Sequence, residues 1–519
     1  MDKPHNVGDQ VEQLRPPIVR SEGLTDTEKY LAALSERTFL NLWSYPNPYR
    51  SQKLNGAGDG KEICDLLVVC DPHILIFSEK KVSWTKTSVD VAWPRWCRRA
   101  VFGAATQLKG AERWINEFPD RIFLDKACEV PFPIALPTAA HRRVHRIIVA
   151  RGAEEAGREY FNGGLGTFVI HPQLKGTDHF DPKAATHMPF AIGDIDPAGD
   201  YVHVFDNVSL EITMSELDTI TDFTEYLDKR ANFIRSGMLG YAHGEEDLLA
   251  YYAIRMIDSG EHDFTPPAGR TWEEVAPMAI GPGNWNRFIS NPQYLAKKEA
   301  DEVSYAWDGL IETFTSHMLG GTSIVLPGHT YSLANSEIAV RQMALQNRLL
   351  RRGYSEAILG ALKIGRSKEV FFRAMLSPEG SARSETGFFF LTLKYLRWMD
   401  ARGGYDKYRE MRSFYLMTYA QGLLMKHPHL HQMVGIGMEP PGQHRGGSED
   451  IIYAVQTDWS EADRNQNRND CGALGIMGEM SPTHYRGQEF PKVQSVVQTR
   501  STGNRKQRRA RAAQGKRHK

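Results

Sequence analysis

The chain has 519 residues, with 63 Lys or Arg and 63 Asp or Glu, so its formal net charge is zero. This balance excludes a polycation, and any affinity for nucleic acid must come from local basic patches. Hydrophobic residues make up 41% of the chain and charged residues 24%, as in ordinary globular proteins. The length predicts two or more domains.

The cysteines argue against a disulfide framework or a zinc ribbon, because their number is odd and they form no Cys-x-x-Cys pair. They are Cys64, Cys70, Cys97, Cys128 and Cys471. Such usage is typical of a reducing compartment. The first residues, MDKPHNVGDQVEQLRPP, contain no apolar signal-peptide core, and no apolar run reaches the about 18 residues that span a membrane. We therefore expect a cytoplasmic protein with no membrane partner.

The N-terminal part predicts alternating helices and strands. Residues 1–23 are polar and contain prolines, so we expect a disordered arm. Thr25 and Glu28 form a capping box that opens a helix running to about residue 43. Two apolar runs follow within 65–81, DLLVVCDPHILIFSEKK. Further along we expect a helix at 95–117, strands at 144–152, 166–171 and 201–207, and a helix at 216–234.

The rest of the chain changes character near residue 238. Helical patterns predominate as far as about residue 425, at 245–258, 293–318, 335–352, 387–400 and 405–425. Strand patterns return at 432–439 and 451–459. We therefore expect an α/β domain at 24–237, a mainly α-helical domain with short C-terminal strands at 238–460, and a polar linker and basic tail at 461–519. The last twenty residues hold nine Lys or Arg and no acid, a composition that stays disordered and binds polyanions.

The two apolar runs at 65–81 predict an antiparallel hairpin that carries a carboxylate at each far end. With a three-residue loop of Asp71, Pro72 and His73, Asp65 would lie directly opposite Glu79. Directly opposed residues have Cβ atoms about 4.5 to 5.5 Å apart, so the two carboxylates would repel each other. A hard divalent cation such as Mg²⁺ would remove this conflict.

The alternation of side chains along a strand also distinguishes the two lysines that follow Glu79. Lys81 would share the face of Glu79, whereas Lys80 would point to the other face. Lys81 is therefore the expected partner of anything that the metal ion holds, although a single β-bulge would exchange the two lysines.

This pattern resembles that of the PD-(D/E)xK, or restriction-endonuclease-like, nuclease superfamily. A helix precedes Asp65, thirteen residues separate Asp65 from Glu79-Lys80-Lys81, and a helix and a strand follow. The resemblance covers roughly residues 27–152, and Cys64 stands where many members have proline. It implies an αβββαβ core with a mixed sheet.

The resemblance also implies roles for individual residues. Asp65 and Glu79 would bind Mg²⁺ or Mn²⁺, and Lys81 would orient or activate the attacking water. Many members add a Glu from the first core helix, where this chain has Glu36, and a polar residue on the helix after the motif, where it has Gln107. Bacterial nucleases of this build often serve in restriction or phage defence.

The residue types suit phosphodiester hydrolysis. A bound Mg²⁺ lowers the pKa of a water molecule and neutralises phosphate oxygens, and a lysine stabilises developing negative charge. The helix at 95–117 offers cations for contacts to the nucleic-acid backbone, with DNA expected rather than RNA. They are Arg95, Arg98, Arg99, Lys109 and Arg113.

Two hypotheses therefore stand. The first is a metal-dependent nuclease whose helical domain positions the substrate or contacts a protein partner or a second copy. The second is a nucleic-acid-binding or scaffold protein whose nuclease-like domain is inactive and whose basic tail supplies the affinity.

Overall fold

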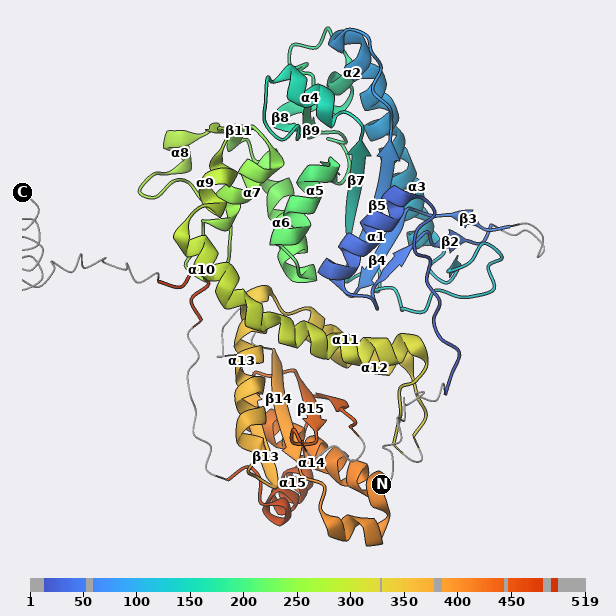
Figure 1. Cartoon of the computed structure of the whole chain (residues 1–519), viewed down its shortest axis with the longest axis vertical. Helices are drawn as coiled ribbons and strands as arrows, with labels where there is room; N and C mark the ends of the chain where they lie inside the picture. Colours follow the sequence, from blue (N-terminus) through green and yellow to red (C-terminus); the bar gives the residue numbers. More distant parts are fainter. Residues whose placement is uncertain are drawn as a thin grey trace, which may run out of the picture.

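The computed structural model describes residues 14–52, 59–326, 329–377, 385–442, 447–478 and 487–492. The fold is mixed α/β. Figure 1 shows two sheet-containing parts that follow one another along the long axis, with helices α11 (Tyr305–Gly320) and α12 (Leu333–Ala344) between them. The first part contains the elements up to α10, and the second contains those from α13 onward.

The central sheet of the first part has five strands in the order β1-β4-β5-β7-β10. Their bounds are Ser44–Pro46, Leu66–Cys70, His73–Lys81, Arg143–Arg151 and Val202–Phe205. β1, β4 and β5 are antiparallel neighbours, whereas β5, β7 and β10 run parallel. Because parallel strands need a crossover, the chain passes through helices between β5 and β7. The carboxyl ends of three strands therefore meet at one edge.

Helices cover both faces of this sheet. On one face lie α1 (Asp26–Phe39), which has the expected Thr25–Glu28 capping box, and α5 (Asn207–Glu216). The other face is covered by α3 (Gly103–Glu117), which continues from α2 (Val89–Cys97) through a π-helical turn, Arg98–Phe102. Phe77 of β5 packs against Phe39 of α1. The neighbouring Ser78 bonds to Gln107 of α3, so successive β5 side chains alternate between the two faces.

Two smaller sheets complete the first part. One has the order β3-β2-β6, with the bounds Lys61–Glu62, Tyr49–Arg50 and Ile122–Phe123. The other has the order β12-β11-β8-β9, with the bounds Met278–Ile280, Leu239–Ala242, Val169–Lys175 and Ala191–Asp194. The remaining helices are α4 (Glu154–Tyr160), α6 (Ile220–Arg235), α7 (Glu245–Ala253), α8 (Trp272–Val275), α9 (Asn284–Ile289) and α10 (Pro292–Asp301).

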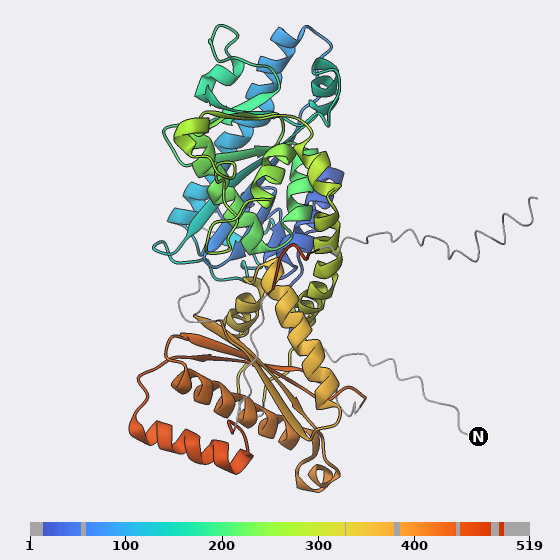
Figure 2. The same cartoon turned by 90° about the vertical axis from the view of Figure 1, so that its left-hand side faces the viewer.

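The second part is built on a four-stranded sheet with the order β13-β14-β15-β16. The strands are Val370–Met375, Thr386–Leu393, Gln432–Met438 and Asp450–Val455. β14 and β15 are parallel, and the outer pairs are antiparallel. Its helices are α13 (Arg348–Gly365), α14 (Gly404–Lys426) and α15 (Glu461–Leu474). Figure 2 shows α13 and α14 on different sides of this sheet, so both faces are buried.

The helix predicted at 387–400 is wrong, because this stretch contains strand β14. Phe388 and Phe390 face the core on the α13 side, and Phe389 and Leu391 face the core on the α14 side. A strand buried on both faces is apolar throughout, so its sequence shows no period of two and cannot be told from a buried helix. The expected mainly helical domain therefore ends in an α/β unit.

The expected disordered arm is wrong for the residues that the structure describes. The backbone N–H groups of Leu14 and Arg15 donate to the carbonyl of Gly321, and that of Ile18 donates to the carbonyl of Leu319. These bonds attach the segment to the end of α11. Residues 1–13 and the basic tail from residue 493 lie outside the described residues.

Side chains anchor both the turn of the β4–β5 hairpin and Trp43, the residue before β1, to α12. Trp43 Nε1 donates to Glu337 Oε1 at 2.7 Å, and Arg341 pairs with Asp71 at 3.3 Å. Glu337 also pairs with Arg341 at 3.4 Å. The hairpin is thereby joined to the helices that lead into the second part.

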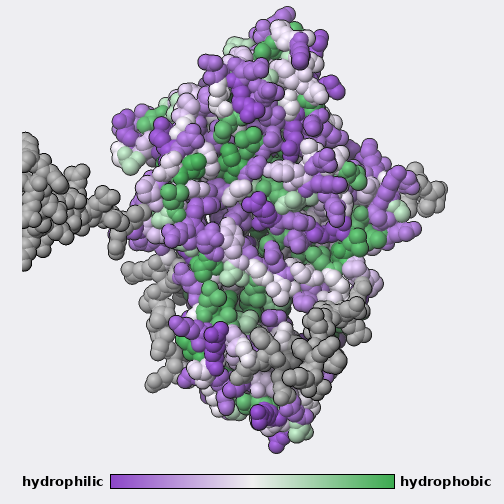
Figure 3. Space-filling model, in the orientation of Figure 1, coloured by the Kyte–Doolittle hydropathy of each residue, from purple (hydrophilic) through white to green (hydrophobic). Residues whose placement is uncertain are grey.

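Figure 3 shows hydrophilic side chains predominating over the end of the molecule formed by α2 and α4. Within the described ranges, no helix combines the length and the apolar character needed to cross a membrane.

Candidate carboxylate and lysine site

The hairpin of the predicted site has a register one residue away from the expected one. Its turn contains only Asp71 and Pro72, joined by a cis peptide bond, and Cys70 pairs with His73. Leu66 pairs with Phe77, so the predicted position of Asp65 opposite Glu79 is wrong, and continuing the ladder places Asp65 opposite Ser78. The sequence identifies the residues of the turn, but it does not show how many of them lie outside the strand pairing.

Asp65 nevertheless lies beside Glu79 through the main chain. Asp65 Oδ2 accepts a hydrogen bond of 2.6 Å from the backbone N–H of Glu79, and the Asp65 N–H donates to the Phe77 carbonyl at 3.2 Å. Burial raises the pKa of Asp65, and the charge of Glu28 adds to the rise. The hydrogen bond from Glu79 and the charge of Lys80 oppose it.

The side chain of Glu79 is buried on the face covered by α1. Its Oε1 pairs with Arg151 Nε of β7 at 2.5 Å. Burial raises the pKa of Glu79, and the nearby charges of Asp65 and Glu28 add to this effect, whereas a hydrogen bond from Thr27 and the Arg151 guanidinium lower the pKa. Glu79 therefore has an internal cation partner.

Two further carboxylates belong to the site and were not predicted from the sequence. The Asn47 side-chain amide donates to Glu28 Oε2 and to Glu62 Oε1, both at 3.0 Å, and so bridges α1 and β3. Burial raises the pKa of Glu62, with Asp65 and Glu28 adding to the rise. We call Glu28, Glu62, Asp65 and Glu79 the carboxylate cluster. The sequence marks Glu28 only as part of a helix cap. For Glu62, its position shortly before Asp65 is the only sequence feature that could have placed it near the site.

Lys80, rather than the expected Lys81, is the lysine of the carboxylate cluster. Lys80 is half-buried, and its charge lowers the pKa of both Asp65 and Glu62. Lys81 is exposed. The exchange follows from the register, because Lys80 shares a strand face with Ser78, the residue opposite Asp65.

The two residues assigned only by the resemblance have different surroundings. Gln107 lies on α3, and its side-chain oxygen accepts a hydrogen bond of 3.1 Å from Ser78 Oγ, so it faces the strand that carries Lys80. Glu36 lies on α1 but pairs with Arg20 at 3.0 Å and is partly exposed. Glu28, about two turns earlier on the same helix, is the α1 carboxylate that acts on Asp65 and Glu79.

The predicted nucleic-acid contacts lie along α2, the π-helical turn and α3. Arg95, Arg98, Arg99 and Arg113 are exposed, whereas Lys109 pairs with Asp196 at 2.8 Å. The Arg98 guanidinium lies over the ring of Phe180 at 4.6 Å.

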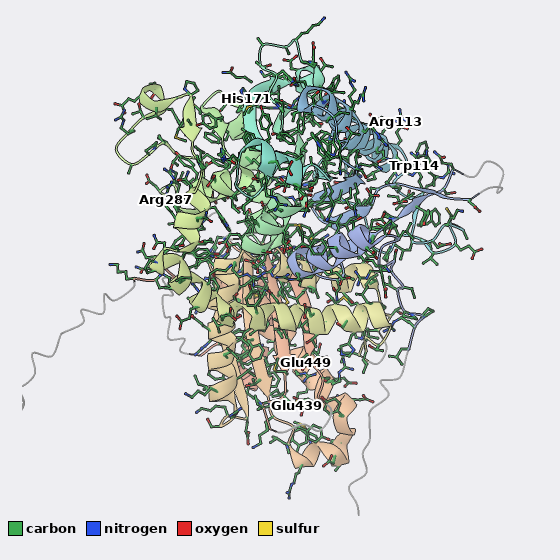
Figure 4. The ribbon with its side chains drawn as sticks, turned by 45° about the horizontal axis from the view of Figure 1, so that its top comes forward. Arg113, Trp114, His171, Arg287, Glu439 and Glu449 are labelled. Atoms are coloured by element: carbon green, nitrogen blue, oxygen red, sulfur yellow. The ribbon has the colours of Figure 1, made fainter. Side chains whose placement is uncertain are left out.

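One more cation accompanies Arg113. Figure 4 shows Arg113 and Trp114 next to each other on α3. The guanidinium of Arg50, on β2, lies 5.3 Å from the Trp114 ring. Burial lowers the pKa of Arg50, and the charge of Arg113 lowers it further. Arg50 of β2 and Arg113 of α3 therefore form a basic patch, and β2 pairs with β3, the strand that carries Glu62.

The carboxylate cluster supplies oxygen donors of the kind that a hard cation prefers, and burial is the main cause of the raised pKa values of Glu62, Asp65 and Glu79. Among the described residues, no group of three or more His, Cys, Asp or Glu side chains is arranged to hold a metal ion. Mg²⁺ needs only one or two carboxylates, since water and phosphate oxygens complete its shell. The residue types are therefore those that Mg²⁺ prefers, and the cluster would supply it with at most a small set of protein donors.

Comparisons with protein-family models, with curated proteins and with solved structures give no match to this chain. The case for a function therefore depends on the arrangement of the residues themselves.

Proposed function

We propose that the chain is a metal-dependent nuclease that hydrolyses phosphodiester bonds. The observation that carries this proposal is the carboxylate cluster, in which Asp65, Glu62 and Glu79 have raised pKa values and Lys80 lies beside two of them. Carboxylates whose pKa values are raised by burial and by neighbouring charges are often found at sites that bind a cation or transfer protons.

The order of the elements supports the same proposal. α1, β1, β4, β5, the α2–α3 crossover and β7 follow one another, with β4 and β5 antiparallel and β7 parallel to β5. This is the order that the resemblance to PD-(D/E)xK nucleases implies. The cluster also lies where ligands commonly bind in open α/β sheets, since Glu79 and Arg151 are near the carboxyl ends of parallel strands.

The roles follow from the positions of the side chains. Asp65 and Glu79 would hold Mg²⁺ or Mn²⁺, with Glu62 as a third carboxylate. When bound, the ion supplies an activated water and neutralises phosphate oxygens. Lys80 places a positive charge next to Asp65, where negative charge develops during hydrolysis. Arg50 and Arg113 would bind the phosphate backbone beside the cluster.

A second function is favoured by the ion pair between Arg151 and Glu79. Because Arg151 already neutralises Glu79, the same fold could bind nucleic acid without a metal ion and without cleaving it. The chain would then be a nucleic-acid-binding or scaffold protein.

Cleavage assays separate these two functions. Linear and circular DNA, and RNA, are incubated with the full chain in Mg²⁺, Mn²⁺ or EDTA. We expect metal-dependent cleavage that falls by at least about 100-fold in Asp65→Asn and Glu79→Gln. Glu36→Gln is the matched control, because Glu36 pairs with Arg20 at the surface.

Each result has a clear meaning. Cleavage that persists in both Asp65→Asn and Glu79→Gln contradicts the site. Binding of nucleic acid without cleavage under any metal condition supports the second function. Loss of cleavage in Glu36→Gln would instead support the role that the resemblance implies for Glu36.

A further inference from the structure

A cavity of about 460 Å³ lies between α7, β12 and α9 and shares no residue with the carboxylate cluster. Its volume falls within the range of about 300 to 1,000 Å³ that is usual for small-molecule sites. Tyr251 and Ile254 contribute from the α7 side, Ile280 from β12, and Arg287 and Phe288 from α9.

The charges in this cavity are all positive. Arg255 and Arg287 line it, and none of the described residues that line it is acidic. In the described part of the chain neither arginine forms an ion pair. Arg287 is exposed, and its Nη2 donates only to the Asn284 side-chain oxygen at 2.8 Å. Figure 4 shows Arg287 at the outer margin of the first part, where a ligand can reach it.

Arg255 is half-buried without a compensating carboxylate. Its guanidinium lies 3.4 Å from the centre of the Tyr251 ring, and its Nη1 donates to the Tyr251 carbonyl at 3.1 Å. Burial lowers the pKa of Arg255, so the charged form is held in an unfavourable environment. An anion in the cavity would remove that penalty.

The rest of the lining is apolar, with two carboxamides. Ile254 is 58% exposed at the cavity, whereas Phe288 is 6% exposed and forms part of the wall. The Asn291 side-chain oxygen caps α10 by accepting from the Gln293 N–H, which leaves its amide N–H groups available to a ligand. The Asn284 amide donates to the Gly281 carbonyl.

We propose that this cavity binds a small organic anion that carries both a phosphate group and an aromatic base, of the size of a nucleoside monophosphate. The two guanidinium groups offer planar donors that match phosphate oxygens. Tyr251, Ile254 and Phe288 supply the aromatic and aliphatic surface that a base would contact. The site is separate from the proposed nuclease centre and does not depend on it.

The test uses the full chain in EDTA, so that no metal ion recruits phosphate to the carboxylate cluster. The probes are the four common ribonucleoside 5′-monophosphates, with adenosine and inorganic phosphate as the separated halves. Calorimetry gives the affinity and thermal unfolding gives an independent shift in Tm. We expect at least one monophosphate to bind more tightly than either half.

Three variants and a control locate the site. Arg255→Gln and Arg287→Gln should each weaken binding by at least about tenfold, since a hydrogen bond to a charged group is lost. Ala279→Trp leaves both arginines in place and fills the cavity from exposed Ala279 on β12, so it should also abolish binding. Arg366→Gln, exposed at the end of α13, should bind like the unmodified chain.

The outcomes decide the proposal. Failure of all four monophosphates to bind at millimolar concentration overturns it, as does equal binding by Arg255→Gln, Arg287→Gln and Ala279→Trp when their unfolding curves are unchanged. If inorganic phosphate alone binds as tightly as a monophosphate, the proposed contact between the cavity and an aromatic base is wrong. Loss of binding in Ala279→Trp with a normal Tm supports the cavity even if Arg255→Gln fails to fold.

Discussion

Asp65 accepts a hydrogen bond of 2.6 Å from the backbone N–H of Glu79, while the Glu79 side chain turns toward Arg151. The two acids are thus neighbours through the main chain and not through directly opposed side chains. Asp65→Asn therefore removes the charge but keeps a side-chain oxygen that can accept the hydrogen bond from the Glu79 backbone.

The lysine that serves the site can be identified by removing the charge of each lysine in turn while keeping a side chain of similar length. Lys80→Met should reduce metal-dependent cleavage by at least about 100-fold, because Lys80 is the cation whose charge acts on Asp65 and Glu62. Lys81→Met, at an exposed neighbouring position, should retain activity within about threefold. Single-turnover cleavage rates measure both. The reverse ranking would contradict the assignment of Lys80.

The ion pair between Arg151 and Glu79 should compete with a metal ion. Arg151→Met leaves Glu79 buried without its cation, so the free energy of unfolding in EDTA should fall by about 3 kcal/mol. Mg²⁺ should then raise the Tm of this variant more than it raises the Tm of the unmodified chain. Arg158→Met, on α4, is the control. An equal Mg²⁺ effect on all three proteins would argue against a metal ion at Glu79.

Glu246 should make stability depend on pH. It is 6% exposed, its Oε2 accepts a hydrogen bond of 2.8 Å from Thr167, and burial raises its pKa to about 7, with Asp247 and Asp206 adding to the rise. A raised folded-state pKa means that stability is full below about pH 4.5 and is lost as the pH rises through about 7. Glu246→Gln does not titrate.

Urea unfolding at several pH values tests this expectation. Glu246→Gln should be more stable than the unmodified chain at pH 8, by up to about 3 kcal/mol, and the difference should vanish near pH 4.5. Glu155→Gln, at an exposed glutamate on α4, should show no such trend. A constant difference across the pH range would mean that Glu246 does not change protonation.

The histidine pair of the central sheet should act in the opposite direction. His73 Nδ1 and His145 Nε2 are 3.1 Å apart on β5 and β7, and burial lowers their pKa values to about 4 and about 3. The unfolded chain takes up these protons near pH 6.5, so stability is lost as the pH falls below that value, by up to about 1.4 kcal/mol per pH unit for each imidazole.

The measurement is the slope of the unfolding free energy between pH 7 and pH 5. His145→Gln should have a shallower slope than the unmodified chain, whereas His141→Gln, at an exposed position, should not. A slope unchanged in His145→Gln would show that the buried pair does not titrate on unfolding.

Several elements could be predicted because their sequences carry a local signal. Thr25 and Glu28 marked the start of α1, and the apolar period marked α3 and the hairpin strands. The register of the hairpin could not be predicted in the same way. A difference of one residue in the turn changes which of the two lysines, Lys80 or Lys81, shares a strand face with Asp65, and no local pattern fixes the length of that turn.

The composition of the site depended on contacts between distant segments. Glu28 and Glu62 meet through the side chain of Asn47, which joins α1 to β3, and the Asn47 N–H donates to the Asp65 carbonyl. Such a meeting arises from packing and leaves no spacing pattern in the sequence. The strand β14 was missed for a related reason, since two layers of helices bury both of its faces.

The anchored hairpin turn connects one end of β5 to helix α12. Asp71 is held by Arg341 of α12, and β5 runs from this turn to Lys80 without interruption. A strand of this kind spans about 3.3 Å per residue. The turn that Arg341 holds and the residues Glu79 and Lys80 therefore lie at opposite ends of one strand of the central sheet.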